Sequence, residues 1–79
     1  MNIAEYIPTD TWVRNYKAMK NPKLLGCLAD FRAVVDLGYS PAAFSHECAV
    51  NRVIEHGGDI YENYERCKDE ARSRGLTVV

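Results

Sequence analysis

The chain has 79 residues, of which 47% are hydrophobic and 27% are charged, and its formal net charge is -1. This length allows one domain and excludes a second, and the composition excludes a disordered chain, which would carry fewer hydrophobic residues. The small net charge gives no overall field that would favour nucleic acid or an anionic membrane, and no apolar run reaches the roughly 20 residues of a membrane span. Because residues 1–8 lack the basic region of a secretory signal, we expect a cytoplasmic protein.

Two prolines mark helix starts. Asn21-Pro22 and Ser40-Pro41 each place a side-chain acceptor and a proline ahead of an apolar segment. The acceptor can cap a backbone N–H, and proline at the first helical position loses no hydrogen bond. With Asp10 and Asp59 as further caps, these signals predict an all-α fold, a compact bundle of about four short helices behind a short N-terminal arm. The expected arm is Met1–Pro8, and the expected helices of this single domain (1–79) span about 10–20, 22–37, 41–56 and 59–74.

The first expected helix, over 10–20, has an apolar side and a basic side. Its apolar stripe consists of Trp12, Val13, Tyr16 and Met19. Its basic residues recur every three positions and are Arg14, Lys17 and Lys20. The spacing fits an amphipathic helix whose basic side faces solvent or an acidic partner.

The second expected helix, over 22–37, is apolar on two sides and closes at Gly38. One face is wide and suits a core, and the other consists of the small residues Gly26, Ala29 and Ala33. Glycine inside a helix costs about 1 kcal/mol relative to alanine, so Gly26 predicts close approach by a neighbouring helix. Either other helices of the monomer cover the small-residue face, or it forms a homodimer contact or a groove for another protein.

The third and fourth expected helices are bounded by glycines and a cap. The helix over 41–56 carries an apolar stripe with His46 in its middle and ends at Gly57-Gly58. The helix over 59–74 begins at Asp59, with Glu62 placed to complete a capping box, and ends at Gly75.

Residue types that support catalysis or metal binding are scattered. Cys27, Cys48 and Cys67 fall on three different helices and lack the close pairs of a zinc or redox site, so we expect reduced thiols in the core. His46 fits a core or partner-facing residue better than a catalytic base, since no nucleophile stands in a pattern with it. We therefore expect no enzymatic activity, no metal and no cofactor.

A helix-turn-helix DNA-binding protein is the alternative interpretation. The helices over 22–37 and 41–56, joined through a short turn containing Gly38, have the layout of that motif. However, Glu47 occupies the position where the motif needs an apolar residue, and the second helix offers few basic residues. Nucleic acid is therefore the second choice of partner.

Aromatic surface favours a protein partner. Four short helices cannot enclose five tyrosines and a tryptophan together with both apolar faces of the helix over 22–37, and exposed aromatic residues are preferred anchors in interfaces. We expect a module that binds another protein as a regulator, adaptor or inhibitor, alone or as a homodimer, and that has no membrane partner. By size it resembles phage and bacterial accessory proteins, including inhibitors of host defence systems. The expected contact residues are Trp12, Arg14, Tyr16, Lys17 and Lys20, followed by Tyr39 and Tyr61.

Overall fold

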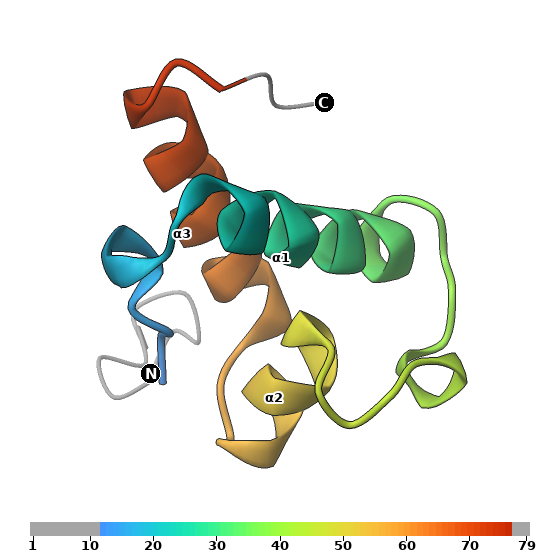
Figure 1. Ribbon diagram of the computed structural model, residues 1–79. Helices are drawn as coiled ribbons and strands as arrows, with labels where there is room; N and C mark the ends of the chain where they lie inside the picture. The colour runs from blue at the N-terminus through green and yellow to red at the C-terminus, as the bar shows by residue number, and fades with distance from the viewer. Residues whose placement is uncertain (1–11, 77–79) are drawn as a thin grey trace, which may run out of the picture.

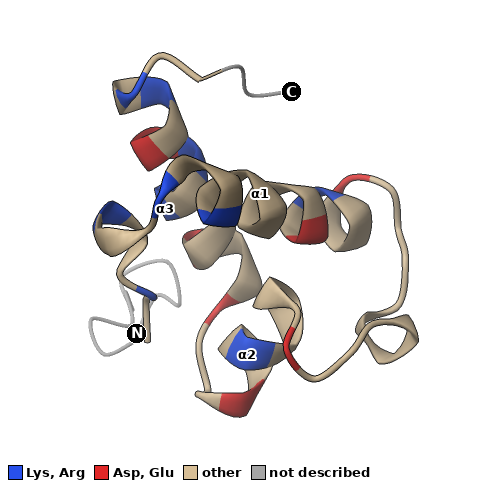
Figure 2. Ribbon diagram, viewed as in Figure 1, with Lys and Arg blue, Asp and Glu red and all other residues tan. Residues whose placement is uncertain are grey.

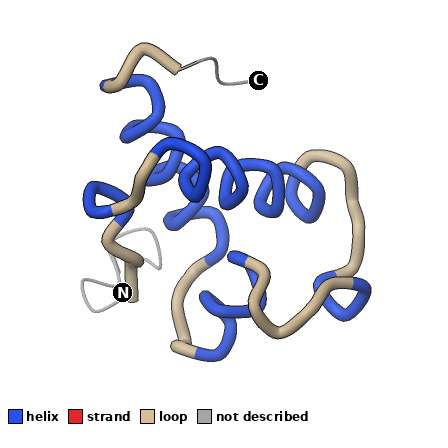
Figure 3. The backbone as a smooth tube through the Cα atoms, in the orientation of Figure 1, coloured by secondary structure: helices blue, strands red, loops and turns tan. Residues whose placement is uncertain are grey.

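The computed structural model describes residues 12–76, which form three α-helices and two single turns of 3₁₀ helix. The elements are η2 (Tyr16–Ala18), α1 (Asn21–Val35), η3 (Pro41–Ala43), α2 (Ala49–Glu55) and α3 (Ile60–Ser73). In Figure 1, α3 crosses behind α1 and α2 lies below both, and Figure 3 shows the loops on either side of η3. No strand occurs within 12–76, so the expected all-α class is confirmed, with three α-helices instead of four. In the same range, no helix has the length and apolar character of a membrane span.

The expected helix over 10–20 is wrong except for one turn. Residues 12–15 have no regular secondary structure, and only η2 is helical. The cause is the buried side chain of Asn63 in the first turn of α3, whose Nδ2 donates to the Trp12 carbonyl at 2.9 Å and whose Oδ1 accepts the Arg14 backbone N–H at 3.1 Å. A helix over 10–20 would need these same backbone groups for its own hydrogen bonds. The expected arm, Met1–Pro8, and the expected cap, Asp10, lie outside the described residues.

The Asn63 amide uses its full hydrogen-bonding capacity. Besides the two bonds above, Nδ2 donates to the Asp59 carbonyl at 2.9 Å, and Oδ1 accepts the Tyr16 hydroxyl at 2.7 Å. We call this set of four bonds the Asn63 lock, since an amide group offers two donors and two acceptor sites. Gly58 makes room for it, because a Cβ at that position would lie 2.5 Å from the Trp12 carbonyl oxygen.

The expected helix over 41–56 is broken into η3 and α2. Its first turn is capped as expected, with the Ala42 N–H donating to Ser40 Oγ at 3.3 Å. The chain then leaves the helix because the Asn51 side chain donates to three carbonyl groups upstream of it. The acceptors are the carbonyls of Pro41, Phe44 and Ser45, at 3.0, 3.4 and 2.9 Å. His46 therefore lies exposed in a loop, and not on an apolar stripe as expected.

The other expected helix boundaries are close to the observed ones. Pro22 lies in the first turn of α1, and Gly38 and Gly75 have the positive φ angles of helix-ending glycines, 79° and 73°. Asp59 caps α3 by accepting the Glu62 N–H at 3.0 Å. Asn21 does not cap α1 as expected, because its Oδ1 accepts a hydrogen bond from Arg74.

The core lies where the three helices meet. Its residues are Tyr16, Leu24, Cys27, Phe31, Cys48, Ala49, Val50, Val53, Tyr64, Cys67 and Ala71. The Phe31 ring is at the centre, edge-on to Tyr16 and stacked on Tyr64 with ring centroids 6.3 and 5.9 Å apart. The close approach expected at Gly26 is not made: no described atom of another element lies within 4 Å of the place of its Cβ.

Replacing Asn63 tests the lock. The variant Asn63→Ala leaves the Arg14 N–H, the Trp12 carbonyl and the Tyr16 hydroxyl without partners, and each such buried group costs about 1–3 kcal/mol. We expect the free energy of unfolding in urea to fall by about 3 kcal/mol or more. The matched control is Asn15→Ala, since Asn15 is exposed and makes no side-chain cap bond. A loss in Asn63→Ala no larger than in the control would contradict the lock.

Candidate functional site

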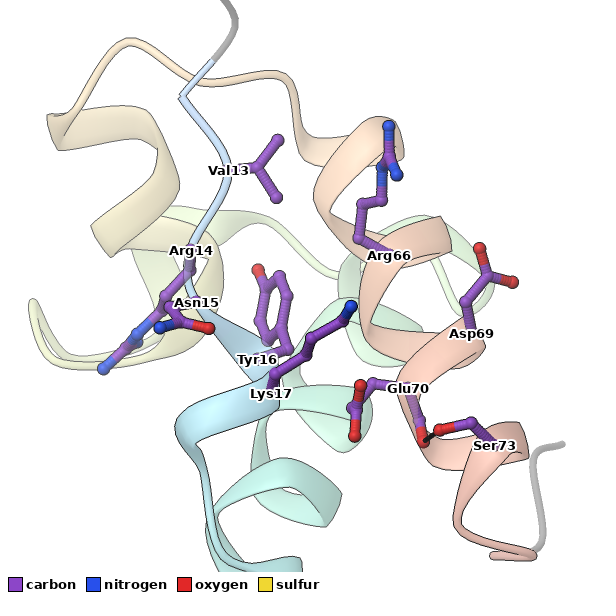
Figure 4. A pocket seen from close by; sticks show the side chains of 9 residues that line it. All are labelled: Val13, Arg14, Asn15, Tyr16, Lys17, Arg66, Asp69, Glu70 and Ser73. Carbon is purple, nitrogen blue, oxygen red and sulfur yellow. Dashed lines mark hydrogen bonds between the residues drawn. The ribbon is translucent and has the colours of Figure 1, made fainter.

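A groove of about 630 Å³ runs between the segment before α1 and one face of α3 (Figure 4). We call it the α3 groove. Its lining residues are Val13, Arg14, Asn15, Tyr16, Lys17, Arg66, Asp69, Glu70 and Ser73. The α3 residues recur at helical spacing, and the other wall is the segment that the Asn63 lock keeps out of a helix.

Arg74 fixes the other end of the wall that the segment before α1 forms. Its Nε donates to Glu70 Oε2 at 2.8 Å, and its Nη1 donates to Asn21 Oδ1 at 2.9 Å. Its Nη2 donates to the carbonyls of Tyr16 and Lys17, both at 3.2 Å. One guanidinium group thus joins α3, η2 and the start of α1, using the fork of donors that arginine provides.

The side chains of the wall differ in direction. Figure 4 shows the Lys17 side chain extending across the groove toward α3, while the Arg14 guanidinium is directed away from it. Both residues are held through their backbone atoms, because Asn63 accepts the Arg14 N–H and Arg74 donates to the Lys17 carbonyl. Their charged ends are therefore not used to build the fold.

Charge pairing differs between two segments of the described chain. Every Lys and Arg within 52–74 forms an ion pair with an Asp or Glu that lies three or four residues away in the sequence. The pairs are Arg52–Glu55, Arg66–Glu62, Lys68–Glu65, Arg72–Asp69 and Arg74–Glu70. By contrast, 12–29 contains no Asp or Glu (Figure 2), and none of its four basic residues forms an ion pair within the described residues. We call Arg14, Lys17 and Lys20 the basic strip.

The structure brings together only some of the expected contact residues. Tyr16 is buried, with 3% of its surface exposed, so it is a core residue and not a surface anchor. Trp12 is half-buried and stacks on His56 with ring centroids 4.2 Å apart. Tyr39 and Tyr61 are exposed, at 57% and 68%, but Tyr39 follows the end of α1 opposite to the basic strip and Tyr61 lies in the first turn of α3.

Four groove residues on α3 were not among the expected contacts: Arg66, Asp69, Glu70 and Ser73. Their helical spacing shows in the sequence that they share a face. Nothing local in the sequence shows which segment lies opposite that face, because the contact depends on the Asn63 lock. Val13 was expected on the apolar stripe of a helix, but it lies at the edge of the groove and is 37% exposed. Its position also depends on the Asn63 lock.

The buried titratable groups are held in their neutral forms. Burial raises the pKa of the Tyr16 phenol above its usual range, which keeps it a hydrogen-bond donor to Asn63. Burial likewise raises the pKa of the Cys27 thiol, and it raises that of Cys67 to about 12. Thiolate is the nucleophilic and metal-binding form of cysteine, so neither residue is activated. Within 12–76, no three His, Cys, Asp or Glu side chains are grouped to hold a metal ion.

The geometry assumed by the helix-turn-helix alternative is not present in the described chain. The loop and turn over 36–48 separate α1 from α2, and α2 begins only at Ala49. Arg52, the one basic residue of α2, is paired with Glu55 at 3.6 Å.

Comparisons with known proteins provide no family for this arrangement. No protein-family model, no curated protein and no solved structure matches the chain. The function is therefore inferred from the residues of the α3 groove and the basic strip themselves.

Tyr64 allows a test of how burial controls titration. Its hydroxyl donates to Asp36 Oδ2 at 2.7 Å, and burial, assisted by this hydrogen bond, raises its pKa to about 12. Tyrosine in an unfolded chain titrates near 10. The contribution of the Tyr64 hydroxyl to the free energy of unfolding is therefore complete below pH 10 and is lost as the pH rises through 12. We expect Tyr64→Phe to be less stable than the wild type by about 1 kcal/mol at pH 8, with the difference shrinking and then reversing in sign between pH 10 and 12. Urea unfolding at each pH measures this.

The control is Tyr61→Phe, because Tyr61 is exposed and makes no hydrogen bond through its hydroxyl within the described residues. It should match the wild type at every pH. A stability difference for Tyr64→Phe that stayed constant up to pH 12 would contradict the raised pKa.

Proposed function

We propose that this protein is a non-enzymatic binding module that docks an acidic segment of a partner protein on the basic strip and in the α3 groove. Such a module acts as a regulator, adaptor or inhibitor of its partner, by occupying a surface and not by chemistry. The observation that supports the proposal is the division of charge. The cations of 52–74 are paired within the described chain, whereas Arg14, Lys17 and Lys20 form no ion pair there.

The composition of the groove favours a peptide over a nucleic acid. A phosphate backbone is uniformly anionic and binds best to a continuous basic surface. Here the wall opposite the strip carries Asp69 and Glu70, so the groove does not present the continuous basic surface that such a backbone needs. A peptide can place acidic residues against the strip and polar residues against α3. Its apolar residues can contact Val13, which lies at the edge of the groove in the segment before α1.

The form of the strip favours recognition that is fast and specific. The backbone at Arg14 and Lys17 is already fixed by Asn63 and Arg74, so little of this segment has to become ordered when a partner binds. Complementary charge mainly raises association rates and selects among partners. Trp12, beside the strip, and the exposed Tyr39 and Tyr61 are proposed as secondary anchors.

Charge reversal on the strip tests the proposal. The wild type and the double variant Lys17→Glu/Lys20→Glu are immobilised and exposed to a lysate of the organism that encodes the chain, and captured proteins are identified by mass spectrometry. We expect a partner with an acidic segment that the variant captures at least tenfold less well, with the thermal midpoint nearly unchanged because both side chains are exposed.

The matched control is Arg32→Glu/Arg52→Glu, which makes the same change in net charge at two positions outside the strip and outside the α3 groove. It should capture the partner as well as the wild type. Equal capture by the strip variant would contradict the proposal. Binding to random duplex DNA that falls steeply with salt and is lost in the strip variant would instead favour a nucleic-acid partner.

A further inference from the structure

The outward side of α1 has the composition of an interface. With 3.6 residues per turn, the residues opposite the core positions Leu24, Cys27 and Phe31 form a continuous surface along the helix. We call this surface the outer face, and it consists of Pro22, Leu25, Gly26, Ala29 and Ala33. Leu25 is 42% exposed and Gly26 and Ala29 are exposed, so the rest of the described chain does not cover them.

A hollow of about 240 Å³ lies beside the outer face. Its lining residues are Arg14, Pro22, Lys23, Gly26, Cys27, Asp30, Glu47 and Ala49. Asp30 uses Oδ2 to accept the Ala49 N–H at 2.9 Å, which fixes its carboxylate at the edge of the hollow. Lys23, on the same helix, forms no ion pair with it or with any other residue of 12–76.

The charges of this side of α1 are arranged so that a second copy complements them. Lys23 and Asp30 lie on the same flank of the outer face, about two turns apart. In an antiparallel helix pair with a twofold axis beside Gly26, Lys23 of one copy faces Asp30 of the other, and the reverse contact follows from symmetry. In nearly the same register Leu25 faces Ala29 of the second copy, and the two Gly26 residues face each other at the crossing point.

From these observations we infer that two copies of the chain associate through the outer faces of α1, antiparallel and crossing at Gly26. Lys23 of each copy enters the hollow of the other, where the carboxylates of Asp30 and Glu47 meet its ammonium group. The absence of a side chain at Gly26 lets the two backbones approach closely, which gives a role to a helical glycine that no described neighbour contacts. The hollow and the α3 groove share only Arg14, so this contact leaves Lys17 and the groove open to a different partner.

The size of the contact sets its strength. One helix of 15 residues is about 22 Å long, and a crossing of two such helices belongs to the small, weak class of specific interfaces. The dimer should therefore form and dissociate with concentration, and it should weaken at high salt because Lys23 and Asp30 contribute to it.

Cysteine trapping tests the register directly. In the chain as it stands, Gly26→Cys places two thiols at the crossing point, whereas Ala33→Cys places them far apart in an antiparallel pair and close together in a parallel one. Under mild oxidation with copper phenanthroline we expect disulfide-linked dimer from Gly26→Cys at least tenfold faster than from Ala33→Cys. The native cysteines are buried and do not compete.

Sedimentation equilibrium from micromolar to millimolar concentration supplies the second measurement. We expect Lys23→Glu to weaken association at least tenfold, and Arg72→Glu, the matched control outside the contact, to leave it unchanged. Circular dichroism confirms that each variant is folded. A wild type that stays monomeric to millimolar concentration, or equal trapping of Gly26→Cys and Ala33→Cys, would overturn the inference.

Discussion

The buried amide of Asn63 is the interaction on which the rest of the structure depends. It joins residues separated by about fifty positions in the chain, because its four hydrogen bonds connect the segment before α1 with the first turn of α3. Through Tyr16 it reaches the aromatic centre of the core, and through Trp12 it sets the path along which the α3 groove forms. Buried polar networks of this kind specify one arrangement when every member is satisfied.

Local signals in the sequence were sufficient to predict where most helices begin and end. Pro22, Gly38, Asp59 and Gly75 act through contacts within a few residues, so their roles can be predicted without the fold. The segments over 10–20 and 41–56 were assigned as helices because their spacing is amphipathic. Asn63 and Asn51 override that preference by taking the backbone groups that the helices need, and an asparagine gives no sign in sequence of which distant carbonyl it will bind.

The candidate site, like the fold, could be predicted only in part from the sequence. The basic residues at 14, 17 and 20 stand out by their spacing and by the lack of nearby acidic residues, and the structure places two of them, Arg14 and Lys17, in the lining of the groove. Tyr16 has the same local appearance as a surface aromatic residue, yet its hydroxyl is used inside the lock. The opposite wall on α3 came only from the structure, since a groove is defined by two segments and sequence spacing describes one at a time.

The way in which Asn63 and Arg74 hold the segment before α1 separates the proposed recognition from folding. Both residues bind main-chain atoms, those of Trp12, Arg14, Tyr16 and Lys17, which are present whatever the side chain. The side chains at 13, 14, 15 and 17 can therefore change during evolution without loss of the scaffold. A lineage in which the proposed partner alters its surface can follow it by substitution at these positions, which makes this segment of the described chain suited to rapid divergence.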